Sequence, residues 1–154
     1  MTQIKMIQIA AEMIKQGKTI DQIDIGQKAS MRKTITEADV ATFAQISGDT
    51  NPVHLDAEYA ATTIFKERVA HGILTAGLIS AVLGTQLPGV GCIYLSQSLK
   101  FVAPVKLGDT IEAEAEVIEK LEEKNRVRLR TVCRNQSGQV VIDGEALVMP
   151  LRSA

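Results

Sequence analysis

Residues 72–84 read GILTAGLISAVLG, and this stretch decides the fold. It is apolar in every direction around a helical axis, which predicts a helix buried on all sides rather than one lying on a surface. The run is too short to cross a bilayer, which requires about 20 residues. The glycine and proline residues at 87–91 predict where the helix ends. We therefore expect this segment at the centre of a soluble domain.

The sequence that follows alternates apolar and polar residues with a period of two, which is typical of strands with one buried face. Four such runs cover residues 93–102, 110–121, 126–135 and 139–150, with turns expected at 104–108, 122–125 and 137–138. In the first run Ile93, Leu95, Leu99 and Phe101 share one side. The pattern predicts an α+β fold in which a curved antiparallel sheet wraps around the central helix. Uncovered strand edges then favour a second subunit, so we expect a homodimer or higher homo-oligomer.

A strand near residues 31–36 and two shorter helices are expected before the central helix. Thr36 is a candidate N-cap, with acidic residues in the first turn, and Gly48 is a good terminator for the helix that it begins. The apolar side chains of that helix are Val40, Phe43, Ala44 and Ile46. Asp56 is expected to cap a second, shorter helix.

Composition limits the possible functions. The 154 residues suffice for one core, and 45% hydrophobic with 23% charged residues is ordinary for a globular protein. A net charge of −1 and 3% aromatic residues argue against nucleic-acid or anionic-membrane partners. Cys92 and Cys133 lie far apart in no metal-ligand pattern, and reduced thiols are favoured over a disulfide. The sequence offers no cluster of metal ligands, and neither a metal nor a cofactor is expected.

The N-terminal residues 1–18 are apolar but do not form a signal peptide, because polar residues interrupt them at Lys5, Gln8, Glu12 and Lys15. Apolar residues recur at helical spacing, at Ile4, Ile7, Ala11 and Ile14. We predict an amphipathic helix that ends near Gly17, as an extension to a domain of residues 19–154. The protein is expected to be cytoplasmic.

The segment SGDTNPVH at 47–54 carries the first candidate chemistry. Asp49 and His54 suit general acid–base catalysis, because imidazole titrates near neutrality and Pro52 stiffens the backbone between the two residues. On spacing alone a plain turn explains the segment as well, with Asn51 forming an Asx turn and His54 exposed.

The start of the central helix is the second candidate. The N–H of Gly72 at a helix N-terminus, next to His71, could stabilise a developing oxyanion, although Gly72 could equally serve tight packing. Ser80 and Leu83 lie about one turn apart and could line a pocket or simply pack in the core.

Three segments in order, SGDTNPVHLDAEYA at 47–60, VAHGILTAGLIS at 69–80 and QSLKFVAPVKLGDTIEAEAEV at 97–117, resemble the MaoC-like (R)-specific enoyl-CoA hydratase family. The resemblance runs from about Ile25 to Pro150. It implies a hot-dog fold, a dimer with active sites at the subunit interface, and no cofactor. Residues 1–18 depart from the minimal family domain.

For the site, the resemblance implies that Asp49 and His54 are the catalytic pair and that the Gly72 N–H polarises the thioester carbonyl. It places Ser80 and Leu83 along the acyl pocket. The implied reaction is the reversible syn hydration of trans-2-enoyl-CoA, with coenzyme A or acyl carrier protein as the thioester carrier. A thioesterase of the same fold and a non-catalytic acyl-thioester binding module are the alternatives.

Overall fold

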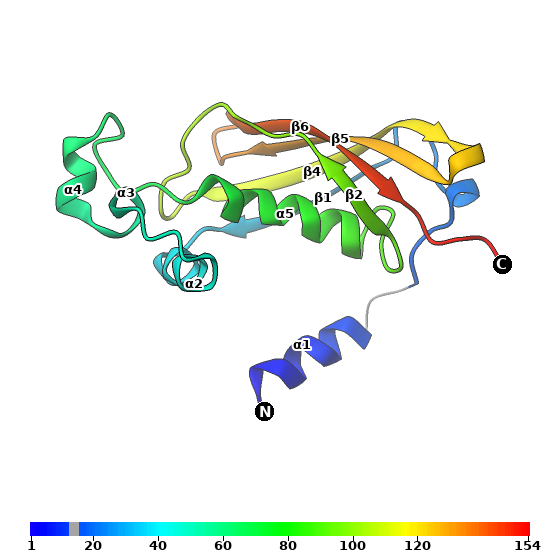
Figure 1. The fold of residues 1–154 in the computed structure, drawn as a ribbon, viewed down its shortest axis with the longest axis horizontal. Coiled ribbons are helices and arrows are strands. Elements are labelled where there is room, and N and C mark those ends of the chain that lie inside the picture. Colours follow the sequence, from blue (N-terminus) through cyan, green and yellow to red (C-terminus); the bar gives the residue numbers. More distant parts are fainter. Residues whose placement is uncertain (13–15) are drawn as a thin grey trace.

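The computed structural model describes the backbone of residues 1–12 and 16–154, and the side chains of residues 1–9 and 16–154. Its sheet is antiparallel with the order β1-β4-β5-β6-β2, and β3 pairs with β6 (Figure 1). The strands are β1 (Lys28–Thr34), β2 (Ile93–Gln97), β3 (Lys100–Phe101), β4 (Thr110–Leu121), β5 (Arg126–Arg134) and β6 (Val140–Met149). The strands predicted at 110–121, 126–135 and 139–150 are confirmed as β4, β5 and β6, whereas the run at 93–102 forms two strands, β2 and β3.

The long helix lies along one face of this sheet, and the helices within residues 37–62 gather near its N-terminal end (Figure 1). The helices are α1 (Gln3–Glu12), α2 (Glu37–Ser47), α3 (Pro52–Leu55), α4 (Ala57–Thr62) and α5 (Gly72–Thr85), with 3₁₀ turns at Ile20–Gln22 and Glu122–Lys124. The α+β prediction is therefore confirmed, with α5 as the helix on which the sheet packs.

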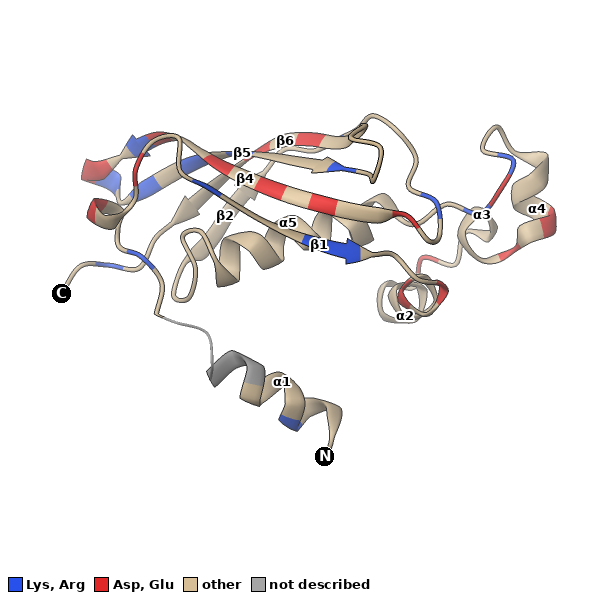
Figure 2. Cartoon of the chain, turned by 180° about the vertical axis from the view of Figure 1, so that it is seen from behind, with Lys and Arg blue, Asp and Glu red and all other residues tan. Residues whose placement is uncertain are grey.

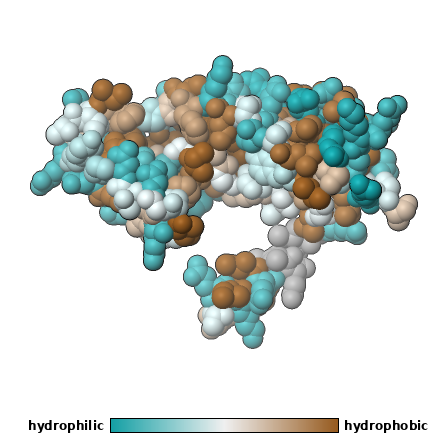
Figure 3. Space-filling view, in the orientation of Figure 1, coloured by the Kyte–Doolittle hydropathy of each residue, from teal (hydrophilic) through white to brown (hydrophobic). Residues whose placement is uncertain are grey.

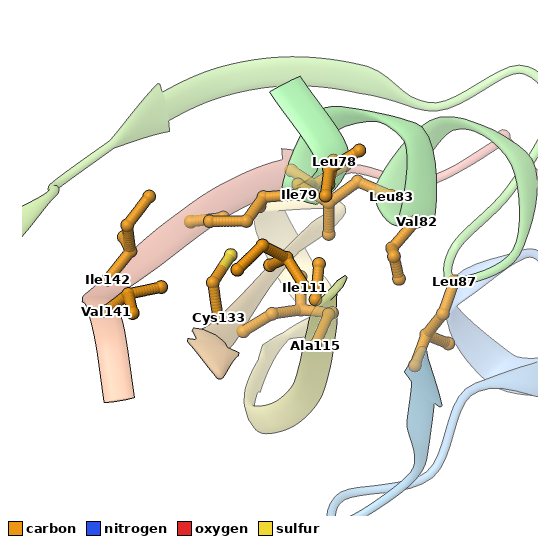
Figure 4. Packing of buried hydrophobic residues seen from close by; sticks show 14 of the residues in the cluster. Leu78, Ile79, Val82, Leu83, Leu87, Ile111, Ala115, Cys133, Val141 and Ile142 are labelled. Atoms are coloured by element: carbon orange, nitrogen blue, oxygen red, sulfur yellow. The ribbon is translucent and has the colours of Figure 1, made fainter. Parts of the chain in front are cut away.

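The core forms between α5 and the concave face of the sheet. Leu78, Ile79, Val82 and Leu83 point from α5 toward the strands (Figure 4). Beneath them β4 presents every second residue, and two of these are alanines, Ala113 and Ala115. Small side chains on the sheet allow the larger helical side chains to fill the space closely, as dense packing requires.

The prediction that α5 is buried on every side is wrong for the single chain. The sheet covers one side of the helix, whereas Ile73, Gly77, Ser80 and Gly84 are exposed on the other. The pattern of apolar residues identifies an apolar surface but not what covers it. A helix side covered by a second protein chain has the same apolar residues as a side covered by the sheet of its own chain.

The edge strand β2 also departs from the prediction. A bulge between Tyr94 and Ser96 breaks the alternation. Ile93, Leu95 and Phe101 are all exposed instead of sharing one buried side. Apolar side chains consequently reach the surface over the part of the molecule where α5 and β2 lie (Figure 3).

Charged residues cover the outer face of the sheet. Figure 2 shows acidic positions along β4 beside basic positions on β1 and β5. Arg32 pairs with Glu112 at 2.7 Å, and Lys28 lies 3.7 Å from Glu116. Because the two signs interleave, this face is not the basic patch that a nucleic acid would need.

Helix α2 begins and ends as predicted. The Asp39 N–H donates to Thr36 Oγ1 over 3.1 Å, the Asp39 carboxylate accepts from the Thr36 N–H over 2.9 Å, and Gly48 ends the helix in the left-handed conformation. Val40 and Ala44 are buried, but the predicted apolar residue Ile46 is 79% exposed. Asp56 caps α4 by accepting from two main-chain N–H groups, as expected.

The N-terminal helix stands away from the sheet (Figure 1), with Ile4 and Ile7 exposed. Its predicted end near Gly17 stays a prediction, because residues 13–15 lie outside the described residues, and Gln16 forms a β-bridge with Val90. Ile14 and Lys15 lie outside the described residues, as does the side chain of Ala11. The division at residue 18 stays a prediction. No helix in the described part of the chain is long and apolar enough to cross a membrane.

Both cysteines are unbonded, as expected. Cys133 is buried in the core, and burial raises the pKa of its thiol to about 12. A thiol protonated to that extent is a packing group rather than a nucleophile.

Candidate active site

Asp49 is placed by the end of α2. Gly48 turns the chain with φ at +77°, a conformation that suits glycine. The Asp49 N–H then donates to Ser47 Oγ over 3.1 Å, and the Asp49 carboxylate accepts from the Asn51 N–H over 3.2 Å. These local hydrogen bonds hold Asp49 in place, although the residue itself is exposed.

His54 lies on a helical turn and not in a loop. Pro52 occupies the first turn of α3, and the Asn51 side chain caps that helix by accepting from the Val53 N–H. The predicted Asx role of Asn51 is thus confirmed, whereas the short helix was not foreseen. Arg68 further anchors this turn, because its Nε donates to the His54 carbonyl over 2.8 Å while its guanidinium pairs with Glu37.

One hydrogen bond sets the tautomer of His54. Its Nδ1 lies 2.7 Å from the main-chain oxygen of Val69. A carbonyl oxygen only accepts, so Nδ1 must carry the hydrogen, and in the neutral ring Nε2 then holds the lone pair. Nε2 is the nitrogen available to take up a proton.

His71 joins this pair, although the only role predicted for it is as the neighbour of Gly72. It is 2% exposed and its ring stacks on that of His54, with centroids 3.9 Å apart. Its Nε2 lies 3.0 Å from the main-chain oxygen of Asp49. One signal in the sequence could have pointed to it, since it is one of only two histidines and stands in an apolar segment.

Asp49, His54 and His71 each offer one ligand atom, and these three atoms all lie within 4.8 Å of one another. Zinc accepts such a donor set. The hydrogen bonds argue against a metal, because His54 Nδ1 and His71 Nε2 are each engaged by a main-chain carbonyl oxygen. Two acceptors that share one water stand about 4.5 Å apart. An Asp49 carboxylate oxygen and a His54 ring nitrogen lie within 4.8 Å of each other, which is close enough for one water to bridge them.

A cavity of about 490 Å³ opens beside His54. Its walls are mostly apolar, and the residues that line it include Phe65, Val69, Thr75, Phe101 and Ile142. Gly72 and Ile73, at the N-terminus of α5, also form part of the wall, and no side chain among the described residues caps this helix. The cavity therefore connects His54 with main-chain N–H groups that lack helical partners.

Gly72 has a steric requirement of its own. A Cβ atom at this position would lie 2.6 Å from the Phe101 ring, closer than real side chains approach. Glycine allows strand β3 and the N-terminus of α5 to meet at the cavity wall.

Ser80 and Leu83 do not border this cavity in the single chain. Ser80 lies on the exposed side of α5, whereas Leu83 is buried against the sheet. The two residues therefore lie on different sides of α5.

The family model described as the MaoC-like domain matches residues 18–137. The chain belongs to the MaoC-like domain family. This confirms the resemblance seen in the three sequence segments, since all of them lie within the matched range.

Individual proteins agree with this membership. The chain is 56% identical to an (R)-specific enoyl-CoA hydratase of Rhodospirillum rubrum, over 84% of this chain and 89% of that protein. It is 50% identical to a 3-hydroxybutyryl-CoA dehydratase of Methylorubrum extorquens, over 83% and 81%. Among solved structures, the unliganded R-hydratase PhaJ1 from Pseudomonas aeruginosa superposes with a TM-score of 0.84 at 54% identity, over 89% of this chain and 88% of that one. The hot-dog fold of this MaoC-like chain is confirmed by these neighbours.

Proposed function

We propose that this MaoC-like chain is an (R)-specific enoyl-CoA hydratase, a hydro-lyase that adds water reversibly to trans-2-enoyl-CoA and yields (R)-3-hydroxyacyl-CoA. One observation carries the proposal: the Asp49 carboxylate and the His54 imidazole lie within 4.8 Å, close enough to share one water, and His54 lines a cavity that extends to Gly72. The relatives named as hydratase and dehydratase correspond to the two directions of this one reaction.

The proposed chemical step uses the tautomer of His54. Asp49 accepts one O–H of the water and orients it, while His54 Nε2 takes the other proton as the water oxygen bonds to the β-carbon. The resulting Nε2–H then gives a proton to the α-carbon. Hydroxyl and hydrogen arrive from the same cluster on one side of the double bond, which accounts for syn addition. Water is consumed, and both residues return to their starting state.

Charge that develops on the thioester oxygen needs a stabilising donor. The N–H of Gly72 at the start of α5, aided by the helix dipole, has the required character. A single oxyanion donor of this kind contributes about 2.7–4 kcal/mol of transition-state stabilisation. The apolar walls of the cavity suit the acyl chain, whereas the pantetheine arm of the carrier leaves through the mouth near Phe65 and Phe101, both of which are exposed.

The substrate is an acyl thioester, with coenzyme A as the proposed carrier and acyl carrier protein as the other possibility. The functional unit is proposed to be a homodimer. The exposed side of α5 and the bulged edge strand β2 bring Ile73, Ile93 and Leu95 to the surface, and a second copy would cover them. The assignment of Ser80 and Leu83 to an acyl pocket stays a prediction. The exposed position of Ser80 fits a pocket only if the second subunit supplies the opposite wall.

The experiment that tests this function is hydration of crotonyl-CoA, followed through loss of the conjugated enoyl absorbance with chiral analysis of the product. We expect loss of the chromophore, no release of free thiol, and the (R) product. Thiol release would indicate a thioesterase instead. Binding of the substrate without turnover would indicate a non-catalytic module.

A further inference from the structure

We infer that His71 is a positioning residue, which holds Asp49 and His54 in the relative placement that hydration requires. This inference rests on the proposed function, because it assigns His71 a role through those two residues. It concerns a side chain that is nearly fully buried, at 2% exposed. His71 therefore acts without touching the substrate.

The first contact is to the main chain that carries Asp49. His71 Nε2 donates to the Asp49 carbonyl oxygen over 3.0 Å. The other bonds of Asp49 are local and come from its neighbours Ser47 and Asn51. The bond from His71 is thus the long-range restraint that ties this exposed turn to the N-terminus of α5.

The second contact is to the face of the His54 ring. The two imidazoles stack at 3.9 Å with their planes inclined by 32°. Val69 restrains His54 in the plane of the ring through the Nδ1 hydrogen bond, whereas His71 restrains it from above. Phe43, with its centroid 4.7 Å from that of His71, packs against His71 in turn and links it to α2. His54 is thereby held in two directions.

Neither nitrogen of His71 is placed to exchange a proton with the substrate. Its Nε2 is committed to the Asp49 carbonyl, and its Nδ1 is buried with no hydrogen-bond partner among the described residues. As the N-cap of α5 it also directly precedes Gly72. One residue thus connects the two proton-handling groups with the helix N-terminus proposed to receive the thioester oxygen.

The test compares variants that remove one contact at a time. His71→Phe keeps an aromatic ring to stack on His54 and Phe43 but loses the donor to Asp49. His71→Gln keeps a donor but loses the stack. We expect kcat for crotonyl-CoA hydration to fall about 10- to 100-fold in each, since a displacement of about 1 Å costs about that much. KM should stay within about threefold, because the cavity walls are unchanged.

A matched control is Val82→Ala, a core truncation three turns along the same helix. It should lower thermal stability while leaving kcat near the wild-type value, so that loss of stability alone cannot explain the effect. Should His71→Phe fail to fold, His71→Gln carries the same expectation. Wild-type kcat in a folded His71 variant, or an equal loss of kcat in Val82→Ala, would overturn the inference.

Asp49→Asn separates this inference from the proposed function. If Asp49→Asn is inactive while the His71 variants are fully active, only the role of His71 fails. If Asp49→Asn itself turns over normally, the proposed function fails first.

Discussion

The Nδ1 atom of His54 lies 2.7 Å from the main-chain oxygen of Val69, and this contact determines which ring nitrogen is available for chemistry. Because a carbonyl cannot donate, the neutral ring must carry its hydrogen on Nδ1. The proposed uptake of a proton at Nε2 depends on this tautomer.

We predict that nitrogen-15 NMR at alkaline pH will show His54 in the Nδ1–H form. His71 should show the opposite tautomer, because its Nε2 donates to the Asp49 carbonyl. Having only two histidines in the chain makes the assignment simple, with His54→Ala as the spectral control. A predominant Nε2–H form of His54 would remove the base from the proposed step.

Replacing Gly72 with alanine is predicted to damage activity more than stability. The added Cβ would lie 2.6 Å from the exposed Phe101 ring, which can swing outward, but it would also obstruct approach of a thioester carbonyl to the helix N-terminus. We expect kcat/KM to fall by about 10²-fold or more, the effect of losing one oxyanion donor.

The double variant Gly72→Ala/Phe101→Ala serves as the control for that substitution. It removes the clash with the ring without clearing the helix N-terminus, so its activity should remain low. Recovery of wild-type activity in the double variant would indicate that displacement of Phe101 caused the loss.

The edge strand provides a test of the proposed dimer. Ile93 on β2 is 51% exposed, and a lysine there would place an unpaired charge in the proposed interface. We predict that the wild type sediments at twice the chain mass in analytical ultracentrifugation and that Ile93→Lys shifts toward monomer. Ile46→Lys is the matched control, since Ile46 is 79% exposed and belongs to α2, outside the β2 and α5 segments of the proposed interface. Equal sedimentation of all three proteins would refute this interface.

Asp39 gives α2 a pH-dependent contribution to stability. Burial disfavours its ionised form, but the Thr36 N–H and the Lys33 ammonium, 3.0 Å away, outweigh burial and lower the Asp39 pKa. A carboxyl whose pKa is lowered by folding stabilises the protein above its unfolded pKa of about 3.9, and the contribution is lost as pH falls through the folded value.

Asp39→Asn, an isostere of the protonated form, should therefore lower the free energy of unfolding by about 1 kcal/mol at neutral pH. In urea titrations the gap to the wild type should close as the pH approaches the folded pKa. A gap that is unchanged in acid would show that the carboxylate charge is not responsible.

The sequence predicted the elements whose signals are local. The capping pattern at Thr36, the left-handed terminator Gly48 and the alternation along β4 all depend on residues close together in the chain, and each was confirmed. The resemblance correctly identified the family and its fold.

The failures concern contacts between distant segments. The stack of His71 on His54 joins residues that local patterns treat independently, so no periodicity could predict it. The prediction that α5 is buried on all sides failed for a related reason. The hydrophobicity of Ile73 indicates that another surface covers it, but it cannot specify whether this chain or a second one provides that surface. The short helix α3 is not predicted, because its turn-forming residues also suit a loop.

The most direct test of the central claim is the turnover of crotonyl-CoA by Asp49→Asn and His54→Gln, with folding verified by circular dichroism. If the two side chains share the water that is added, each variant should lose at least about 10²–10⁴-fold in kcat, the range typical of general acid–base groups, while keeping the wild-type spectrum. Turnover near the wild-type rate in either folded variant would contradict the account.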